Sequence, residues 1–373
     1  MNTKELLSID WLSVNYIVEC SPLFNGLEYH INNLKFIPEK YSTRQFRYVY
    51  YVYIVGQKEE IATIVCHPLS KILDARLHQV KLANWCLYTN LAKIYIREIK
   101  QALSAQYLSL SRLDVCIDMV GFDFYGFIND YHNNKIREKR PKEVTEHYKR
   151  YNNGSVYTGI SWGSKSSDWT AKIYDKIREV NEVSGKQYIL DYFEANGIDT
   201  KNEKVWRYEF SVNNVAKEYR INDEIITFDD ENIFEFSNQL KFAMAYENLH
   251  AFAYNSGKVR FVDEKRYRIT NLLLREIPPK RVRSSRRKKK DYSAKVSINL
   301  GMQLLQYQTC IEAYITYKNI LEVARDYNLS EWLIRKYGEE LQKIYIEKSF
   351  VMYGAGIKRE RTVDLFTKKE YIE

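Results

Sequence analysis

The sequence predicts an α+β protein: a largely antiparallel sheet with flanking helices, followed by a small all-helical domain. The strongest indication is alternation of apolar and polar residues in Ser111–Val120, Trp169–Arg178 and Val205–Val212. A period of two is typical of strands with one buried face. Antiparallel strands interspersed with helices favour an α+β fold over a doubly wound parallel sheet.

Strand patterns dominate the region before these three stretches. Phe46–Val55 is aromatic and β-branched, and a turn at 56–59 leads into a second strand, Glu60–Cys66. Leu77–Cys86 is a further strand candidate, and Thr89–Leu103 has an apolar stripe at helical spacing.

The other elements follow from the same patterns. We predict a short helix at Phe122–Tyr131, an exposed charged loop at Ile136–Arg150, a hairpin of Ser155–Trp162 with Trp169–Arg178, and helices within Val183–Asn196 and Glu231–Leu249.

A basic segment marks the predicted domain boundary. Lys280–Lys290 holds eight Lys or Arg residues and no acid, in a chain of net charge +9. The positive charge is therefore local, which favours a dedicated basic tether. Pro278 and Pro279 precede it and break regular structure. We predict a catalytic domain at 1–275, a basic linker at 276–293 and a helical domain at 294–373.

Within the helical domain, Ile320–Tyr337 resembles a helix-turn-helix. Leu329 falls in the turn and Ser330 is placed to cap the second helix. That second helix carries Arg335, which we expect to contact DNA in a major groove. A plain helical hairpin for oligomerisation fits the same pattern.

Composition excludes several classes of protein. No apolar run approaches the roughly 20 residues of a membrane span, and the N-terminal stretch lacks the apolar segment of a signal peptide. The five cysteines are scattered without a CxxC pair, so neither a disulfide framework nor a zinc ribbon is indicated. We expect a cytoplasmic protein without a membrane partner.

Two catalytic motifs are missing from the sequence. The six histidines lie outside the three alternating strands and form no His-hydrophobic-His triplet. Gly154–Ser161 has the glycine spacing of a phosphate-binding loop, but Ile160 replaces the lysine. A histidine-based nicking site and self-contained ATP-driven helicase activity are therefore not supported.

The polar faces of the three strands carry ionisable groups at alternate positions. Side by side in one sheet, they would gather Arg112, Asp114, Asp118, Tyr174, Arg207 and Glu209 on one surface. Carboxylates beside a tyrosine and arginines suit a Mg²⁺ or Mn²⁺ site that holds a phosphate. A solvated sheet face with cross-strand ion pairs fits the same pattern.

Tyr174 stands between Lys172 and Lys176 on its polar face. Neighbouring cations lower the cost of forming a phenolate, whose ordinary pKa is about 10, and they attract phosphate. This pattern indicates a nucleophile that attacks a DNA phosphodiester. An ordinary surface tyrosine is the alternative in a chain with 32 tyrosines.

The order of these motifs resembles the replication-initiation-factor family. This family comprises the trans-acting initiators of small rolling-circle plasmids and the related relaxases of some integrative conjugative elements. The matching stretches are Ile9–Val14, Arg112–Asp118, Tyr157–Gly159, Ile173–Lys176 with Glu179, and Trp206–Glu209. The resemblance covers residues 8–250. The GSKSSD insertion before Trp169 and the C-terminal region depart from the family pattern.

The resemblance implies roles for individual residues. Tyr174 corresponds to the nicking tyrosine, and Asp114 and Glu209 to the metal-site carboxylates. Asp118 ranks second on spacing, because it lies about 13 Å from Asp114 along an extended strand and cannot share one ion with it unless the strand bends. The phosphate-positioning candidates, which rest partly on the resemblance, are Arg112, Lys172, Lys176 and Arg207. Sequence-independent contacts to phosphates are expected from Arg286, Arg287, Lys288, Lys289 and Lys290.

The implied activity is origin-specific nicking and joining of a DNA strand, dependent on Mg²⁺ or Mn²⁺, through a covalent 5′-phosphotyrosine. Such a reaction would initiate rolling-circle replication of a plasmid, phage or other mobile element. The implied partners are double- and single-stranded origin DNA, a host helicase and polymerase, and a second copy of the chain. A relaxase would use the same chemistry, whereas a non-enzymatic DNA-binding regulator would need only the basic linker and the helix-turn-helix.

Overall fold

The computed structural model describes residues 4–23, 26–70, 73–140, 142–152, 154–164, 167–216, 218–221, 224–258, 260–270, 282–284, 289–305, 310–326 and 329–354. The chain forms two compact units, Met1–Ser285 and Arg286–Glu373. A large antiparallel sheet with flanking helices makes up most of the first unit, and helices make up the second. The predicted α+β class is confirmed.

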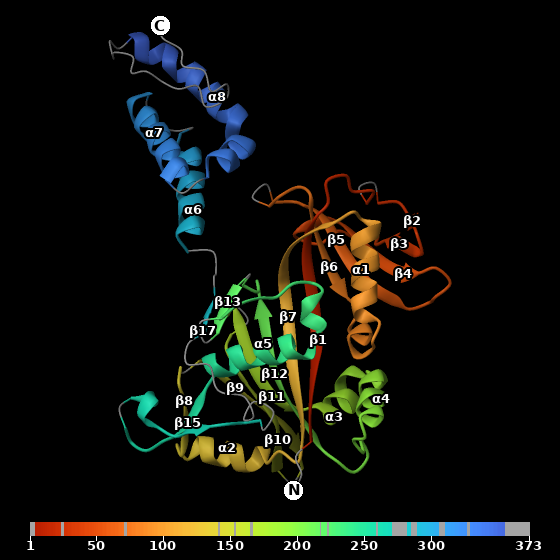
Figure 1. Cartoon of the computed structure of the whole chain (residues 1–373). Helices are drawn as coiled ribbons and strands as arrows, with labels where there is room; N and C mark the ends of the chain where they lie inside the picture. Colours follow the sequence, from red (N-terminus) through yellow and green to blue (C-terminus); the bar gives the residue numbers. More distant parts are fainter. Residues whose placement is uncertain are drawn as a thin grey trace. The chain divides into compact units, whose positions relative to one another are not determined.

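An 11-stranded sheet organises the first unit, with the strand order β2-β3-β4-β5-β6-β1-β7-β12-β11-β10-β9 (Figure 1). Every neighbouring pair is antiparallel. The strands are β1 Lys4–Ile17, β2 Tyr29–Ile31, β3 Leu34–Pro38, β4 Phe46–Ile54, β5 Glu60–Pro68, β6 Leu77–Leu82, β7 Gln106–Val120, β9 Val144–Tyr151, β10 Gly154–Trp162, β11 Trp169–Asp175 and β12 Val205–Asn213.

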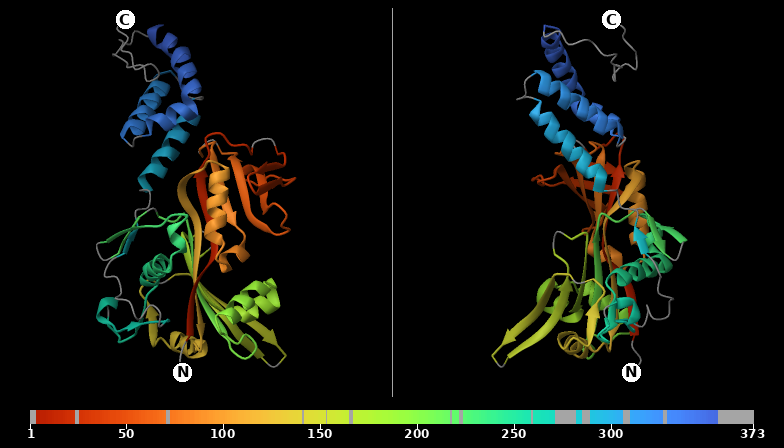
Figure 2. Two further views of the ribbon diagram at one scale, coloured as in Figure 1. Left: turned by 45° about the vertical axis from the view of Figure 1, so that its right-hand side comes forward. Right: turned by 90° about the vertical axis from the view of Figure 1, so that its left-hand side faces the viewer.

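One face of this sheet is apolar and packs on three helices, α1 (Ala92–Ala102), α2 (Phe124–His132) and α5 (Phe236–Leu249). Stacking of Phe124 on Trp206, with ring centres 3.9 Å apart, fixes α2 to β12. The left view of Figure 2 shows α2 and α5 on one side of the central strands. This apolar layer is the main core of the unit.

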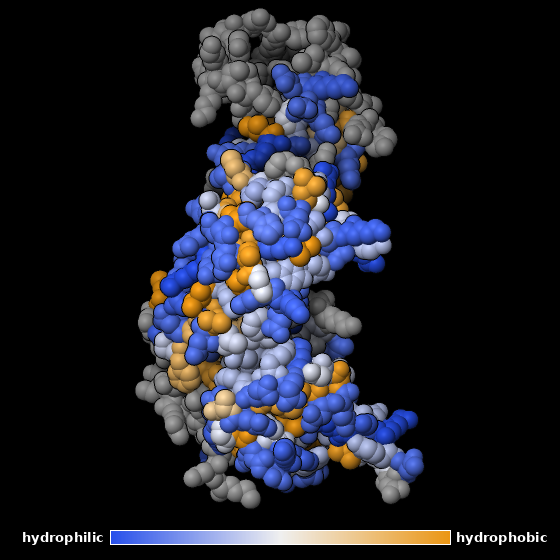
Figure 3. Space-filling view, turned by 90° about the vertical axis from the view of Figure 1, so that its right-hand side faces the viewer, coloured by the Kyte–Doolittle hydropathy of each residue, from blue (hydrophilic) through white to orange (hydrophobic). Residues whose placement is uncertain are grey.

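The opposite face is covered only in part. Three short helices lie at one end of it: α3 (Lys176–Glu179), the π-helix η2 (Val180–Ser184) and α4 (Gln187–Ala195) (Figure 2, left). They enclose a small apolar cluster with the ends of β7 and β12. Hydrophilic side chains cover most of the described surface on the side of α1 and α4, where apolar groups are scattered (Figure 3).

Two three-stranded sheets and several short helices complete the unit. One sheet joins β13 (Glu218–Ile221), β14 (Glu224–Thr227) and β17 (Val282–Ser284), and the other joins β8 (Ile136–Glu138), β15 (Phe252–Tyr254) and β16 (Arg266–Tyr267). The short helices are η1 (Asn84–Tyr88), η3 (Asn232–Phe234) and η4 (Phe261–Asp263).

Three predicted elements differ in the structure. The charged region predicted as a loop contains β8 and β9, and β9 pairs with β10 as an edge strand of the large sheet. The strand predicted to reach Arg178 ends at Asp175, whose carboxylate accepts a 3.1 Å hydrogen bond from the Arg178 N–H and so begins α3. The strand predicted to reach Cys86 ends at Leu82, before η1.

The predicted basic linker, 276–293, is partly regular in structure. It contains β17, which pairs with β13, and the start of α6 (Lys289–Leu304), so that Lys289 and Lys290 begin a helix. Arg286, Arg287 and Lys288 lie outside the described residues.

The second unit contains α6, α7 (Cys310–Asp326) and α8 (Ser330–Gly354) around a small apolar core. The α7–α8 junction coincides with the predicted helix-turn-helix, but α8 continues far beyond Tyr337. Tyr337 donates its hydroxyl to Asn299 of α6 at 2.8 Å, whereas Arg335 is exposed. A DNA-reading helix and an oligomerisation hairpin both remain compatible with this arrangement. In the described part of the chain, no helix has the length and apolar character needed to cross a membrane.

Candidate active site

Strands β7, β12 and β11 lie side by side, so their polar faces merge into one surface. Tyr174 is paired with Arg207 across β11 and β12, and Arg207 is paired with Asp118 across β12 and β7. Two residues along the strands, Lys172 is paired with Glu209. Directly opposed residues share a face of the sheet, so the structure brings these five predicted residues together.

The Tyr174 hydroxyl donates a hydrogen bond of 2.9 Å to Glu209 Oε2. The other carboxylate oxygen, Oε1, lies 2.9 Å from Lys172 Nζ and accepts a 3.0 Å hydrogen bond from the Ser211 hydroxyl. Burial is the largest influence on Glu209 and raises its pKa, but the charge and hydrogen bond of Lys172 and the charge of Arg207 together outweigh it and leave this pKa below its ordinary value. Glu209 is therefore an ionised acceptor, held next to the phenol at neutral pH.

Tyr174 itself is a poor acid in the free protein. Burial raises its pKa well above the ordinary value, and the negative charge of Glu209 acts in the same direction, against Arg207. The two lysines lie 5.0 Å (Lys172) and 5.5 Å (Lys176) from the ring centre. Burial thus outweighs the effect of these cations, contrary to the prediction that they favour a phenolate, and the phenol needs a base to lose its proton.

Arg207 is fully buried, and carboxylates surround it. Its Nε and Nη2 donate to the two oxygens of Asp118 at 2.6 and 2.8 Å. Its Nη1 donates to Asp10 Oδ1 and to the Tyr88 hydroxyl, both at 2.8 Å. This geometry favours a positioning role for Arg207 over the predicted direct contact with phosphate.

Lys176 and Lys172 differ in access to solvent. Lys176 is the first residue of α3 rather than a strand residue, its side chain is buried, and its Nζ lies 2.8 Å from Glu179. The Lys172 side chain keeps 40% of its surface exposed while it contacts Glu209. Of these two lysines, Lys172 is the one that an incoming phosphate can reach.

Asp114 lies on the same face, beside Glu209, and forms a bidentate pair with Arg112. The Nε and Nη2 atoms of Arg112 donate to it at 3.0 and 2.7 Å. Burial raises the pKa of Asp114 to about 6; Glu209 adds to the shift and Arg112 opposes it. The pKa of Asp114 therefore lies close to neutral pH, unlike that of Glu209.

The predicted metal ligands Asp114, Asp118 and Glu209 do not form a ready-made metal site. Each is bonded to a different cation of the same face, and Asp118 has both oxygens in hydrogen bonds to buried Arg207. Within the described residues, no group of three or more His, Cys, Asp or Glu side chains is placed to hold a metal ion. Asp118 does not fit as a ligand here, and Asp114 and Glu209 fit only if their cations move away.

Asp10 and Tyr88 belong to this surface but were not among the predicted residues. Asp10 lies at an irregularity of β1, between Ile9 and Trp11, where the pairing with β7 shifts register. Burial raises its pKa, but the charges of Arg207 and Lys176 and the hydrogen bond from Tyr88 together hold it far below the ordinary value. The Tyr88 hydroxyl, from η1, also hydrogen-bonds Asp10. The match of Ile9–Val14 to a family strand was the only sequence signal for Asp10, and Tyr88 had none.

Gly159 lies directly opposite Tyr174, on the neighbouring strand β10. A Cβ atom at this position would lie 2.6 Å from the Ile173 carbonyl oxygen and 2.9 Å from the Tyr174 Cβ. The pairing of β10 with β9 also shifts register between Tyr157 and Gly159. Glycine therefore permits the close approach of β10 that sets the position of Tyr174.

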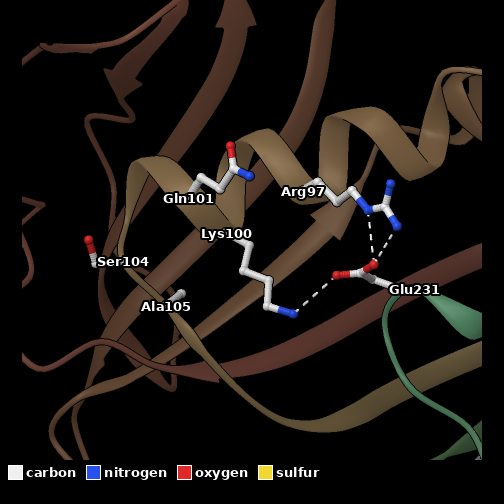
Figure 4. A pocket seen from close by; sticks show the side chains of 6 residues that line it. All are labelled: Arg97, Lys100, Gln101, Ser104, Ala105 and Glu231. Carbon is white, nitrogen blue, oxygen red and sulfur yellow. Dashed lines mark hydrogen bonds and ion pairs between the residues drawn. The ribbon is translucent and has the colours of Figure 1, made fainter.

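A pocket of about 550 Å³ lies elsewhere, between α1 and the segment that carries Glu231 (Figure 4). Arg97 and Lys100 point toward Glu231, with ion-pair distances of 2.6 and 3.5 Å. None of the predicted catalytic residues lines this pocket. Surface ion pairs account for its charged groups.

Comparison with known proteins gives little further information. No family model matches this chain, and no curated protein sequence matches it. One solved structure to which it is similar is that of a rolling circle replication initiator protein from Geobacillus stearothermophilus, at 13% identity and a TM-score of 0.40. The match covers 73% of this chain and 95% of the other. A likeness this distant does not determine chemistry, so the function follows from the chain's own residues.

Proposed function

We propose that this protein is an origin-specific DNA nicking and joining enzyme that starts rolling-circle replication through a covalent phosphotyrosine at Tyr174. The observation that carries the proposal is the 2.9 Å hydrogen bond from the Tyr174 hydroxyl to Glu209. A nucleophile, its base and a cation that orients the base form the arrangement expected for covalent catalysis.

In the proposed reaction, the Tyr174 oxygen attacks the phosphorus of the scissile phosphodiester. Its proton passes to Glu209 Oε2, the bond between phosphorus and the 3′-oxygen breaks, and that oxygen leaves with a proton from water. The 5′-phosphate stays on Tyr174. In the reverse step, a 3′-hydroxyl gives its proton back to the solvent as its oxygen attacks the phosphotyrosine, the bond between phosphorus and the tyrosine oxygen breaks, and Glu209 returns the proton to the phenol.

Lys172 has a second role in this scheme. Before attack, its ammonium group pairs with the ionised Glu209 carboxylate at 2.9 Å. When Glu209 takes the phenol proton it becomes neutral, and the ammonium group of the partly exposed Lys172 side chain is freed to face the charge that develops on the phosphate. Preorganised cations of this kind stabilise a transition state.

The buried network around Arg207 supports the site without touching DNA. It ties β12 to Asp118 of β7 and Asp10 of β1. Dependence on Mg²⁺ or Mn²⁺ stays a prediction. A bound divalent ion would polarise the scissile phosphate, and Asp114 with Glu209 would hold it in a state of the site in which Arg112 and Lys172 have moved away from these carboxylates.

The proposal extends to partners. The substrate is duplex origin DNA, of which one strand is cut. A host helicase then opens the duplex, and a host polymerase extends the free 3′-hydroxyl. Dimerisation and a cytoplasmic location belong to the same proposal. A relaxase of a conjugative element would use the same residues, and coupling and secretion genes next to the coding sequence would identify that role.

The test is incubation with supercoiled DNA that carries the element's own origin, with Mg²⁺ or Mn²⁺. We expect nicked circles with protein attached to a 5′ end, and none from DNA without the origin. Binding without any cleavage would support the alternative, a non-enzymatic DNA-binding regulator, and contradict the proposal.

A further inference from the structure

Two further cations lie on the same sheet face as Tyr174, on strands β6 and β7, with Trp11 of β1 between them. Lys81 Nζ lies 3.9 Å from the centre of the Trp11 ring, and the Arg112 guanidinium carbon lies 4.1 Å from it. Because β6 and β7 flank β1, the two cations reach the indole from opposite neighbouring strands. Cation–π contacts of this kind hold a charge in place.

Both cations keep donors for a ligand. Arg112 uses Nε and Nη2 on Asp114, and its Nη1 has no hydrogen-bond partner among the described residues. For Lys81, the described part of the chain offers the Trp11 ring but no hydrogen bond or ion pair. Partial burial lowers the pKa of Lys81, and the charges of Arg112 and Lys186 add to this shift, against Glu60. An anion placed here would relieve that repulsion.

The register of the sheet fixes where this group lies. Trp11 is paired with Asp114, Asp114 with Ser211, and Ser211 with Thr170. Thr170 precedes Tyr174 by four residues on the same face of β11. The group is therefore about 13 Å along the strands and about 14 Å across them from Tyr174. That separation excludes contact with the scissile phosphate but lies within reach of the same DNA strand.

We propose that Lys81, Trp11 and Arg112 form a phosphate-binding subsite for the backbone of single-stranded DNA, a few nucleotides from the phosphate that Tyr174 attacks. This inference rests on the proposed function, because it assumes that a DNA strand crosses this face. Trp11 orders the two cations and does not stack a base, since its ring is flanked by both. A flexible single strand follows such a charged surface without regard to sequence.

The test uses Tyr174→Phe protein, so that no cleavage occurs. The affinity for a fluorescent oligothymidylate of 20 nucleotides is measured by anisotropy titration at NaCl concentrations from 50 to 200 mM. Adding Lys81→Gln should lower the slope of log affinity against log salt by about 0.7, the value of one phosphate contact with a single strand. Lys81→Arg should restore most of the slope. Trp11→Leu should weaken binding although the net charge is unchanged.

The matched control is Lys135→Gln. Lys135 is an exposed residue after α2, the helix that covers the opposite face of the sheet. Its replacement by Gln removes the same charge as Lys81→Gln. The control should leave the slope unchanged. Equal effects of Lys81→Gln and Lys135→Gln would overturn the subsite, as would parental affinity in Trp11→Leu. Formation of the covalent adduct by the parental protein is measured separately. If no adduct forms, the proposed function is wrong, whereas a lower salt slope for Lys81→Gln would still show that Lys81 contacts a DNA phosphate.

Discussion

Among single residues, Tyr174 and Glu209 are both buried, but their pKa values shift in opposite directions. Burial of the phenol and the negative charge of Glu209 outweigh the charge of Arg207, and the pKa of Tyr174 rises. The carboxylate contacts Lys172, and its pKa falls. A nucleophile that stays protonated beside a base that stays ionised is the state from which proton transfer and attack on phosphorus can occur together.

Replacing the base tests this pairing. Glu209→Gln keeps the shape of the side chain but removes the proton acceptor, so nicking of a single-stranded origin oligonucleotide should fall by about 10²- to 10⁴-fold. DNA affinity should stay within about twofold of the parental value, because Glu209 is buried. Glu182→Gln, at an exposed carboxylate paired with Lys149 and Arg178, is the control. Parental nicking by Glu209→Gln would remove Glu209 from the mechanism.

Asp114 gives a prediction about pH. Its folded-state pKa of about 6 exceeds the ordinary 3.8, so the folded chain binds this proton more tightly than the unfolded chain. The contribution to stability is complete below about pH 3.8 and is lost as pH rises through 6, and it amounts to about 3 kcal/mol. Urea unfolding of the parent and of Asp114→Asn should show the parent's relative stability decreasing from pH 4 to 7. A difference that does not vary with pH would contradict the assigned shift.

At the scale of elements, alternation in the sequence was enough to predict which residues of β7, β11 and β12 share a face. That is why Asp114, Tyr174 and Glu209 were predicted together and are found together. The edge strand β9 was missed because most of its residues are exposed, so neither face shows an apolar pattern. Asp10 and Tyr88 were missed because a register shift and a short helix bring them in from distant parts of the chain.

The contact between β10 and β11 makes a further prediction. Gly159→Ala places a methyl group against Ile173 and Tyr174, at distances that ordinary packing does not permit. The strands must separate, so we expect a loss of about 1–3 kcal/mol in the free energy of unfolding. Nicking should fall more than stability alone explains. Ser155→Ala, at an exposed position of the same strand, is the control, and parental stability and activity of Gly159→Ala would contradict the close approach.

At the scale of the whole molecule, each unit has its own apolar core. The candidate active site lies entirely in the first unit, and the predicted helix-turn-helix lies in the second. No comparison assigns a role to either unit, so the division of labour between cutting and origin recognition stays a prediction from the sequence. The pattern of Ile320–Tyr337 is its only support, because helices and hairpins of this size serve both DNA binding and oligomerisation.

Truncation after Ser285 tests that division. Residues 1–285 should still nick a single-stranded oligonucleotide that contains the cut site, because every residue of the proposed mechanism is retained. Preference for origin-bearing over origin-free supercoiled DNA should disappear. Competition between the two plasmids measures this preference, and unchanged selectivity would show that the first unit reads the origin.

Peptide mapping of the covalent adduct is the direct test of whether Tyr174 is the nucleophile. The adduct formed on origin DNA is digested with nuclease and protease, and the phosphorylated peptide is identified by mass spectrometry. We predict that the 5′-phosphate is on the peptide that contains Ile173-Tyr174-Asp175, and that Tyr174→Phe protein binds the origin with near-parental affinity but forms no adduct. An adduct on any other tyrosine, or an adduct formed by Tyr174→Phe, would contradict the account.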